Sequence, residues 1–274
     1  MRQSPTCHHG GRPQARRPGV ERDCGLWCDR RVRDVFLDLV LGGRCVGCGR
    51  PGRALCRACE DGLPEGPHPA WPTPPPAGLA MPWAAAPYAG TVREMVVAHK
   101  ERRVFALRRP LARLLAGAVR PLASGPVILV PVPSRPGTSR ARGHDPTYAL
   151  TRAAGRLLRI EGYAVAAARL LASRGGVADQ AGLDAATRAS NLAGSMCCPS
   201  DGVRRLSGRR LRVVVCDDVL TTGATAREAQ RALEAAGLEV AGIAAVAATQ
   251  RRARAVSSHR DSSGLRVSSL GDND

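Results

Sequence analysis

Two adjacent carboxylates, Asp217 and Asp218, stand between an apolar run and a small loop that is rich in hydroxyl groups. The loop contains Thr221, Thr222, Gly223, Ala224 and Thr225. Threonine hydroxyls and free backbone N–H groups donate hydrogen bonds to anions, most naturally to phosphate. Two carboxylates cannot bind phosphate themselves, so the acidic pair suits the vicinal hydroxyls of a sugar or a divalent cation. The two features therefore predict a phosphate site beside a sugar or cation site.

The residues around this loop predict a strand before it and a helix after it. Residues 213–216 form an uninterrupted apolar run, which is typical of a parallel strand covered on both faces. After the loop, Thr225 and Glu228 have the spacing of a capping box, and apolar residues recur at helical intervals until Gly237. A helix that begins at such a loop directs free N–H groups and its positive dipole end into it. Thr225 can cap the helix or contact the phosphate, and the sequence leaves both roles open.

Residues 213–225 as a whole resemble the phosphoribosyl pyrophosphate-binding motif of type I phosphoribosyltransferases, with no mismatched position. The resemblance implies that Asp217 and Asp218 hold the ribose hydroxyls and serve catalysis with magnesium nearby. It also implies that residues 221–225 cradle the 5′-phosphate. An ordinary buried strand with an Asp-rich turn is the plainer alternative, but the composition of the turn is too specific to favour it.

Four cysteines near the N-terminus form a second chemical pattern. Cys45 and Cys48 make one Cys-x-x-Cys pair, and Cys56 and Cys59 make another after seven intervening residues. Two such pairs complete a tetrahedral four-sulfur shell, which predicts a structural zinc ion with no open coordination position. A redox dithiol and an iron–sulfur cluster are the alternatives.

Composition bounds the class of protein. The 274 residues are 44% apolar but only 3% aromatic, so the core must be built from Ala, Leu and Val. The net charge of +18 favours polyanionic partners, and Lys100 is the only lysine among the basic residues. No apolar run is long enough to span a membrane or to form a signal peptide, which predicts a cytoplasmic protein. The ten cysteines then indicate metal ligands or free thiols.

The chain divides into five predicted regions. Residues 1–31 are expected to be a disordered basic extension, and residues 250–274 a disordered tail. A zinc-ribbon module (32–62) is followed by a Pro-rich linker (63–82), which is expected to be extended and to separate the module from the rest. Residues 83–249 are predicted to form the main domain, an α/β fold with a parallel sheet flanked by helices.

Within that domain, residues 92–100 predict a helix, and Pro110 is expected to open a second one. A basic cluster lies between them, and it is either a solvated face or a contact for substrate or nucleic acid: Lys100, Arg102, Arg103, Arg108 and Arg109. Later segments predict further strands and helices at 127–134, 146–158, 163–168 and 240–248. The polar stretch 173–191 has the length of a functional or disordered loop.

Residues 135–145 follow a predicted buried strand and are rich in arginine. A basic loop at the end of a parallel strand faces the same crevice as the other strand-end loops. In type I phosphoribosyltransferases a loop in this place grips pyrophosphate, and the resemblance places Ser134 and Arg135 in it. Arg142 is a further candidate for offsetting charge on the pyrophosphate.

A four-cysteine module joined to such a domain resembles the ComF family, which is known for a role in natural competence. The resemblance covers residues 35–249 and rests on several further positions: His99, Lys100, 131–134, Arg142, Gly143, Gln180, Leu183, Arg188 and Asn191. The family commonly continues its Arg-Gly with Phe-Asn-Gln, whereas this chain has His144, Asp145 and Pro146. The resemblance implies phosphoribosyl pyrophosphate as a ligand, and single-stranded DNA and DNA-uptake proteins as partners.

Two hypotheses of different class follow. The first is an enzyme that transfers the phosphoribosyl group to an acceptor that the sequence does not identify. The second is a non-catalytic binding protein that uses the zinc ribbon and the arginines to engage single-stranded DNA, although aromatic stacking residues are few. A zinc-stabilised protein scaffold is a plainer third possibility.

Overall fold

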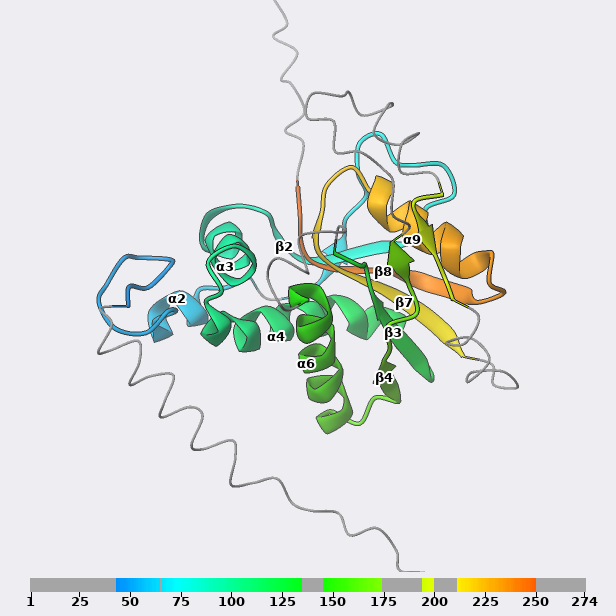
Figure 1. Cartoon of the computed structure of the whole chain (residues 1–274). Coiled ribbons are helices and arrows are strands. Elements are labelled where there is room, and N and C mark those ends of the chain that lie inside the picture. The colour runs from blue at the N-terminus through cyan, green and yellow to red at the C-terminus, as the bar shows by residue number, and fades with distance from the viewer. Residues whose placement is uncertain (1–42, 65, 135–144, 174–193, 200–210, 250–274) are drawn as a thin grey trace, which may run out of the picture.

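A six-stranded, mostly parallel sheet forms the centre of the protein (Figure 1). The computed structural model describes residues 43–64, 66–134, 145–173, 194–199 and 211–249. The strands lie in the order β1 (His68–Pro69), β2 (Pro82–Pro87), β8 (Glu239–Ala248), β7 (Arg212–Leu220), β3 (Val127–Pro131) and β4 (Val165–Ala167). Only β1 and β2 pair antiparallel within this sheet. A separate pair joins β5 (Ala172–Ser173) to β6 (Met196–Cys197).

Helices cover both faces of the sheet, as the apolar strands require. On one face lie α4 (Arg108–Val119) and α6 (Pro146–Ile160), and on the other lies α9 (Ala224–Glu234) (Figure 1). Side chains of β7 lie alternately on the two faces of the sheet. Val214 belongs to the core beneath α4 and α6, whereas Val213 and Val215 belong to the core beneath α9. The predicted α/β fold with a parallel sheet flanked by helices is confirmed.

The shorter elements follow the sequence patterns closely. The predicted helix at 92–100 is α3 (Gly90–Lys100), which is followed by a 3₁₀ turn, η1 (Phe105–Leu107). Helix α4 begins at Arg108, two residues before the predicted opener Pro110, because η1 leads directly into it. A second 3₁₀ turn, η2 (Arg120–Leu122), ends α4, and a one-turn helix, α2 (Arg57–Asp61), carries part of the cysteine module.

The Pro-rich segment is packed into the protein, in contrast to the extended, separating linker that its composition predicts. Ala70 and Leu79 are buried in the core beneath α9, and β1 and β2 add the segment to the edge of the sheet. The cysteine module is packed too, since Cys45 and Leu55 belong to the core that contains α3 and α4. Apolar side chains between the prolines supply the burial that keeps the segment in place.

Several predicted features lie outside the described residues: the basic extension, the first part of the zinc module, the polar stretch at 174–193 and the tail from 250. Among the described residues, no helix has both the length and the apolar character that a membrane span requires.

Candidate functional site

The acidic pair lies inside strand β7, near its carboxyl end, and the strand continues beyond it to Leu220. Each carboxylate accepts a hydrogen bond from the backbone N–H of the next residue: Asp218 N donates to Asp217 Oδ1 at 2.8 Å, and Val219 N donates to Asp218 Oδ1 at 2.9 Å. The Asp218 side chain is only 13% exposed. Both carboxylates are therefore held in fixed positions where the parallel strands end, at the carboxyl edge of the sheet.

Lys100 reaches the acidic pair from the last residue of α3. Its Nζ lies 2.7 Å from Asp218 Oδ2, in an ion pair between residues that are far apart in the sequence. Burial lowers the pKa of Lys100, but the carboxylates of Asp218 and Asp217 outweigh this effect and raise it above the ordinary value. The only lysine of the chain is thus a permanent cation in the site. The sequence placed Lys100 in a basic cluster without linking it to the acidic pair, and its uniqueness was the available signal.

The environment of Asp217 disfavours its charge. Burial, together with the neighbouring carboxylate of Asp218, raises the pKa of Asp217 well above its ordinary value, although Lys100 acts in the opposite direction. A further cation or hydrogen-bond donor beside Asp217 would therefore favour its charged form.

We expect Asp217→Asn to unfold at a higher temperature than the wild type near neutral pH. The native state holds this proton more tightly than the unfolded chain, so the stabilising contribution is present below the ordinary value of 3.8 and is lost as pH rises toward the raised pKa. Asparagine removes the buried charge and keeps an oxygen for the Asp218 N–H. Thermal melts across the acidic and neutral range test this. The difference between the two proteins should shrink on acidification, and a less stable variant at neutral pH would contradict it.

The threonine loop joins β7 to α9 and presents the start of the helix. Gly223 is the N-cap residue with a φ of 75°, a left-handed conformation that favours glycine. Thr221 and Thr222 are exposed, and the N–H of Ala224 donates to Thr222 Oγ1 at 3.4 Å. The first N–H groups of α9, its positive dipole end and the loop hydroxyls could together donate hydrogen bonds to an anion and stabilise its charge.

The predicted capping box is wrong. Gly223 fills the cap position, so Thr225 lies one residue inside the helix and is not its cap. Glu228 makes other contacts. It is buried, accepts a hydrogen bond from the N–H of Met196 at 3.0 Å and forms an ion pair with Arg231 at 2.7 Å. The tertiary contact with β6 outweighs local capping, so of the two roles predicted for Thr225 the cap is excluded, and the contact with a phosphate stays a prediction.

Ser134 follows β3, the neighbour of β7, and lies beside the start of α6. Its Oγ is 3.5 Å from Asp145 Oδ1, and the same Asp145 oxygen accepts from the N–H of Tyr148 at 3.0 Å and so caps α6. Asp145 and Pro146, which depart from the pattern of the resembled family, therefore open the helix as N-cap and first residue. The predicted pyrophosphate ligands Arg135 and Arg142 lie outside the described residues.

The four module cysteines converge as their spacing predicts. Their Sγ atoms all lie within 4.8 Å of one another, with Cys48 and Cys56 3.6 Å apart. Zinc with Zn–S bonds of about 2.3 Å sets sulfur atoms about 3.8 Å apart, so the cluster fits this ion. None of the cysteines in the described ranges is in a disulfide. The four-cysteine cluster is confirmed, and it is compatible with structural zinc.

The thiols of the cluster differ in acidity. Burial acts against the Cys45 thiolate, but N–H groups of Cys56, Cys48 and Gly47 outweigh it and lower the pKa of Cys45 to about 6. Hydrogen bonding to Cys56, with burial, raises the pKa of Cys59 to about 12. The metal-free cluster therefore holds one thiol that ionises near neutral pH, Cys45, and one that resists ionisation, Cys59. A bound cation would favour the thiolate form of both.

A comparison with models of protein families finds a match, and it includes the acidic strand and the threonine loop. Residues 185–269 match the family model described as "Phosphoribosyl transferase domain". This match contains β7, the threonine loop, α9 and β8, and it runs beyond residue 249, where the sequence predicts the domain to end. A comparison with curated protein sequences finds no match. The family match identifies a phosphoribosyltransferase domain in the C-terminal part of the chain.

Proposed function

We propose that the protein binds phosphoribosyl pyrophosphate at the carboxyl edge of the sheet and transfers its phosphoribosyl group to an acceptor. The observation that supports this most strongly is the unit formed by β7, the threonine loop and α9, which joins two fixed carboxylates to a helix N-terminus. A carboxylate pair accepts from ribose hydroxyls, and the helix start binds the 5′-phosphate. The family match over the same residues adds independent support.

Each residue has a defined task in the proposed reaction. The acceptor forms a bond to the anomeric carbon while the bond from that carbon to pyrophosphate breaks, and the electron pair leaves with pyrophosphate. Asp217 and Asp218 orient the ribose, and their charge offsets the positive charge that develops on the ring. Asp217 and Asp218 would also hold a magnesium ion with the pyrophosphate, which would supply further positive charge there. Ser134, Arg135 and Arg142 are the proposed pyrophosphate ligands.

Lys100 is the cation of the described site, and we propose that it also neutralises the pyrophosphate. Lys100→Met is expected to weaken binding of phosphoribosyl pyrophosphate about tenfold or more, because a charge-assisted interaction is lost. Isothermal titration calorimetry measures this. Arg102→Met, an equal charge change on an exposed residue two positions further on, is the matched control. Equal losses in both variants would assign the effect to overall charge and not to Lys100.

The first test of the proposed function is calorimetric titration of the zinc-loaded protein with phosphoribosyl pyrophosphate and magnesium. Saturable binding justifies a screen of nucleobases and amines for acceptor-dependent pyrophosphate release. An absence of binding would overturn the proposal.

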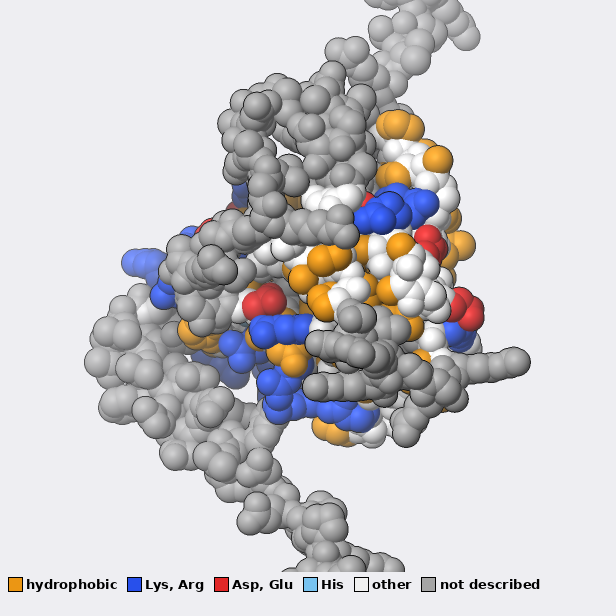
Figure 2. Space-filling model, turned by 45° about the vertical axis from the view of Figure 1, so that its right-hand side comes forward, with side chains coloured by type: hydrophobic (Ala, Val, Ile, Leu, Met, Phe, Trp, Pro, Cys, Tyr) orange, Lys and Arg blue, Asp and Glu red, His pale blue; other side chains and the backbone are white. Residues whose placement is uncertain are grey.

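A second candidate function is single-stranded DNA binding in natural competence, with DNA-uptake proteins as partners in the cytoplasm. The basic balance of the chain supports it, and Figure 2 shows Lys and Arg side chains gathered on one part of the surface. Phe105 is half-exposed, and the Arg108 guanidinium lies 5.4 Å from its ring centroid, which provides a platform on which a base can stack.

If arginines bind DNA in this way, the affinity should fall steeply as salt is added. For each tenfold increase in salt concentration, the logarithm of the affinity should fall by about 0.7 per phosphate neutralised. Fluorescence anisotropy of a labelled oligonucleotide over a salt series measures the slope. A flat response would argue against the arginines as the source of binding.

A further inference from the structure

We propose that the segment from Pro72 to Ala80, the proline wall, is a positioning element that holds the threonine loop in the shape that binds a 5′-phosphate. This inference rests on the proposed function, because it concerns the same ligand site. It gives a role to the segment that composition predicts to be a linker, and it assigns positioning residues on α9 outside the phosphate-binding turn.

The wall presses directly on the turn of the threonine loop. A Cβ atom added at Gly223 would lie 2.9 Å from Pro72 Cγ and 3.2 Å from both Leu79 Cδ2 and Pro76 Cγ. These distances leave no room for a side chain, so the wall and the left-handed backbone conformation independently require glycine at this position. Gly223 immediately precedes the first residue of α9, so the wall contacts the turn from which the first N–H groups of the helix would meet a phosphate.

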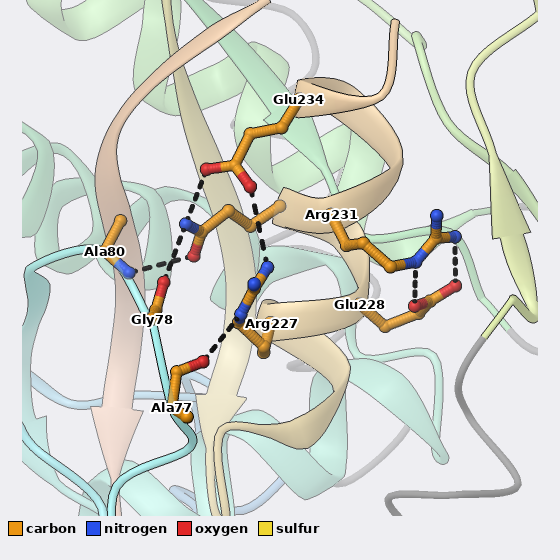
Figure 3. Close-up of polar contacts among 8 residues, drawn as sticks. Ala77, Gly78, Ala80, Arg227, Glu228, Arg231 and Glu234 are labelled. Atoms are coloured by element: carbon orange, nitrogen blue, oxygen red, sulfur yellow. Dashed lines mark hydrogen bonds and ion pairs between the residues drawn. The ribbon is translucent and has the colours of Figure 1, made fainter.

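Helix α9 is hydrogen-bonded to the wall, at Gly78 and Ala80, through a buried glutamine side chain (Figure 3). Gln230 is 4% exposed, and its Oε1 accepts from the N–H of Ala80 at 2.8 Å while its Nε2 donates to the carbonyl of Gly78 at 3.0 Å. Both groups of the side-chain amide are thus used on one short stretch of backbone. Glu234 accepts a further hydrogen bond from Gln230 Nε2 at 2.7 Å and fixes the orientation of the amide.

Arg227, one helical turn before Gln230, forms a further hydrogen bond from α9 to the wall. Its Nε donates to the carbonyl of Ala77 at 2.9 Å, and its guanidinium also pairs with Glu234 at 3.6 Å. The opposite side of α9 carries a separate ion pair, Arg231 with Glu228, which does not face the wall (Figure 3). The helix that offers its N-terminus to the phosphate is therefore the same element that holds the wall against the loop.

This arrangement restricts the loop before a ligand arrives. Prolines have a fixed φ, so ordering the wall costs less conformational entropy than ordering a general sequence. A loop already held in its binding shape loses less entropy on binding, which increases affinity without adding a contact to the ligand. The wall is predicted to act on the phosphate half of the ligand and to leave the pyrophosphate half unaffected.

The experiment compares Gln230→Met with the wild-type full-length, zinc-loaded protein. Methionine keeps the volume of the side chain and removes both hydrogen bonds to the wall. We expect affinity for phosphoribosyl pyrophosphate and for ribose 5-phosphate to fall about tenfold, as for two lost hydrogen bonds, with affinity for magnesium pyrophosphate unchanged. Arg231→Ala is the matched control on the same helix. It should lower the melting temperature at least as much and leave ribose 5-phosphate affinity at the wild-type value.

Pro72→Ala provides a second variant, should Gln230→Met fold poorly, and the same split between the two ligands is expected for it. Equal loss of ribose 5-phosphate and pyrophosphate affinity would show general damage to the site and would overturn the proposal. Wild-type affinity for ribose 5-phosphate in the folded variants would overturn it as well. A wild-type protein that binds none of the ligands overturns the proposed function and this inference together, whereas binding by the wild type with unaffected variants overturns only the inference.

Discussion

Replacing Asp217 and Asp218 together with asparagine is expected to abolish measurable binding of phosphoribosyl pyrophosphate while the fold remains intact. Each asparagine keeps an oxygen that accepts from the following backbone N–H, so strand β7 retains both local hydrogen bonds. The ligand loses two charged acceptors, and hydrogen bonds to charged groups contribute about 1.5–3 kcal/mol each. An affinity loss of about a hundredfold or more follows. Lys100 also loses the partner that holds it at 2.7 Å.

Calorimetric titration of the double variant beside the wild type measures this effect, and thermal melting checks the fold. Glu239→Gln is a suitable control, because Glu239 is an exposed acid at the first residue of the neighbouring strand β8. It should bind like the wild type. Retained binding in a folded double variant would remove the acidic pair from the site.

Cys45→Ser is expected to release zinc and to destabilise the whole protein. Four-sulfur zinc sites contribute folding free energy directly, on the order of 10 kcal/mol in small zinc peptides. Cys45 is buried in the same core as α3 and α4, so loosening of the module reaches the main domain. Because α3 carries Lys100, ligand binding should weaken as a consequence.

Elemental analysis and thermal melting of Cys45→Ser measure the two effects. Cys197→Ser is the control, because Cys197 is a half-buried free thiol in β6, outside the cluster. An unchanged zinc content in Cys45→Ser would exclude the zinc assignment. Acidification provides a second check: protons compete with the ion for the four thiolates, so the zinc content of the wild type should fall as the pH is lowered.

Local patterns predicted the parts of this protein that depend on neighbouring residues. The spacing of Cys45, Cys48, Cys56 and Cys59 predicted a cluster, because two short knuckles determine where their sulfur atoms lie. The apolar run before Asp217 predicted a buried parallel strand, and the residues after the threonine loop predicted the helix that follows it. Each of these features is formed by residues that lie close together in the sequence, so a short segment is sufficient to predict it.

The capping box failed for a tertiary reason. Local spacing assigned Glu228 to the helix start, but its carboxylate is buried against Arg231 and the backbone of β6. A buried, paired carboxylate with a backbone donor is more stable than an exposed cap, and no window of a few residues contains that partner.

By itself, the sequence determined the two chemical centres: the four-cysteine cluster, and the acidic strand with its threonine loop. Only the tertiary structure decided which distant residues contact the acidic strand and its loop. It brings Lys100 from α3 onto Asp218, it places Pro72 against Gly223, and it joins Gln230 to the backbone of Ala80. The physical reason is that these contacts link residues more than a hundred positions apart, whose approach depends on the packing of whole helices on a sheet and not on the preferences of any single segment.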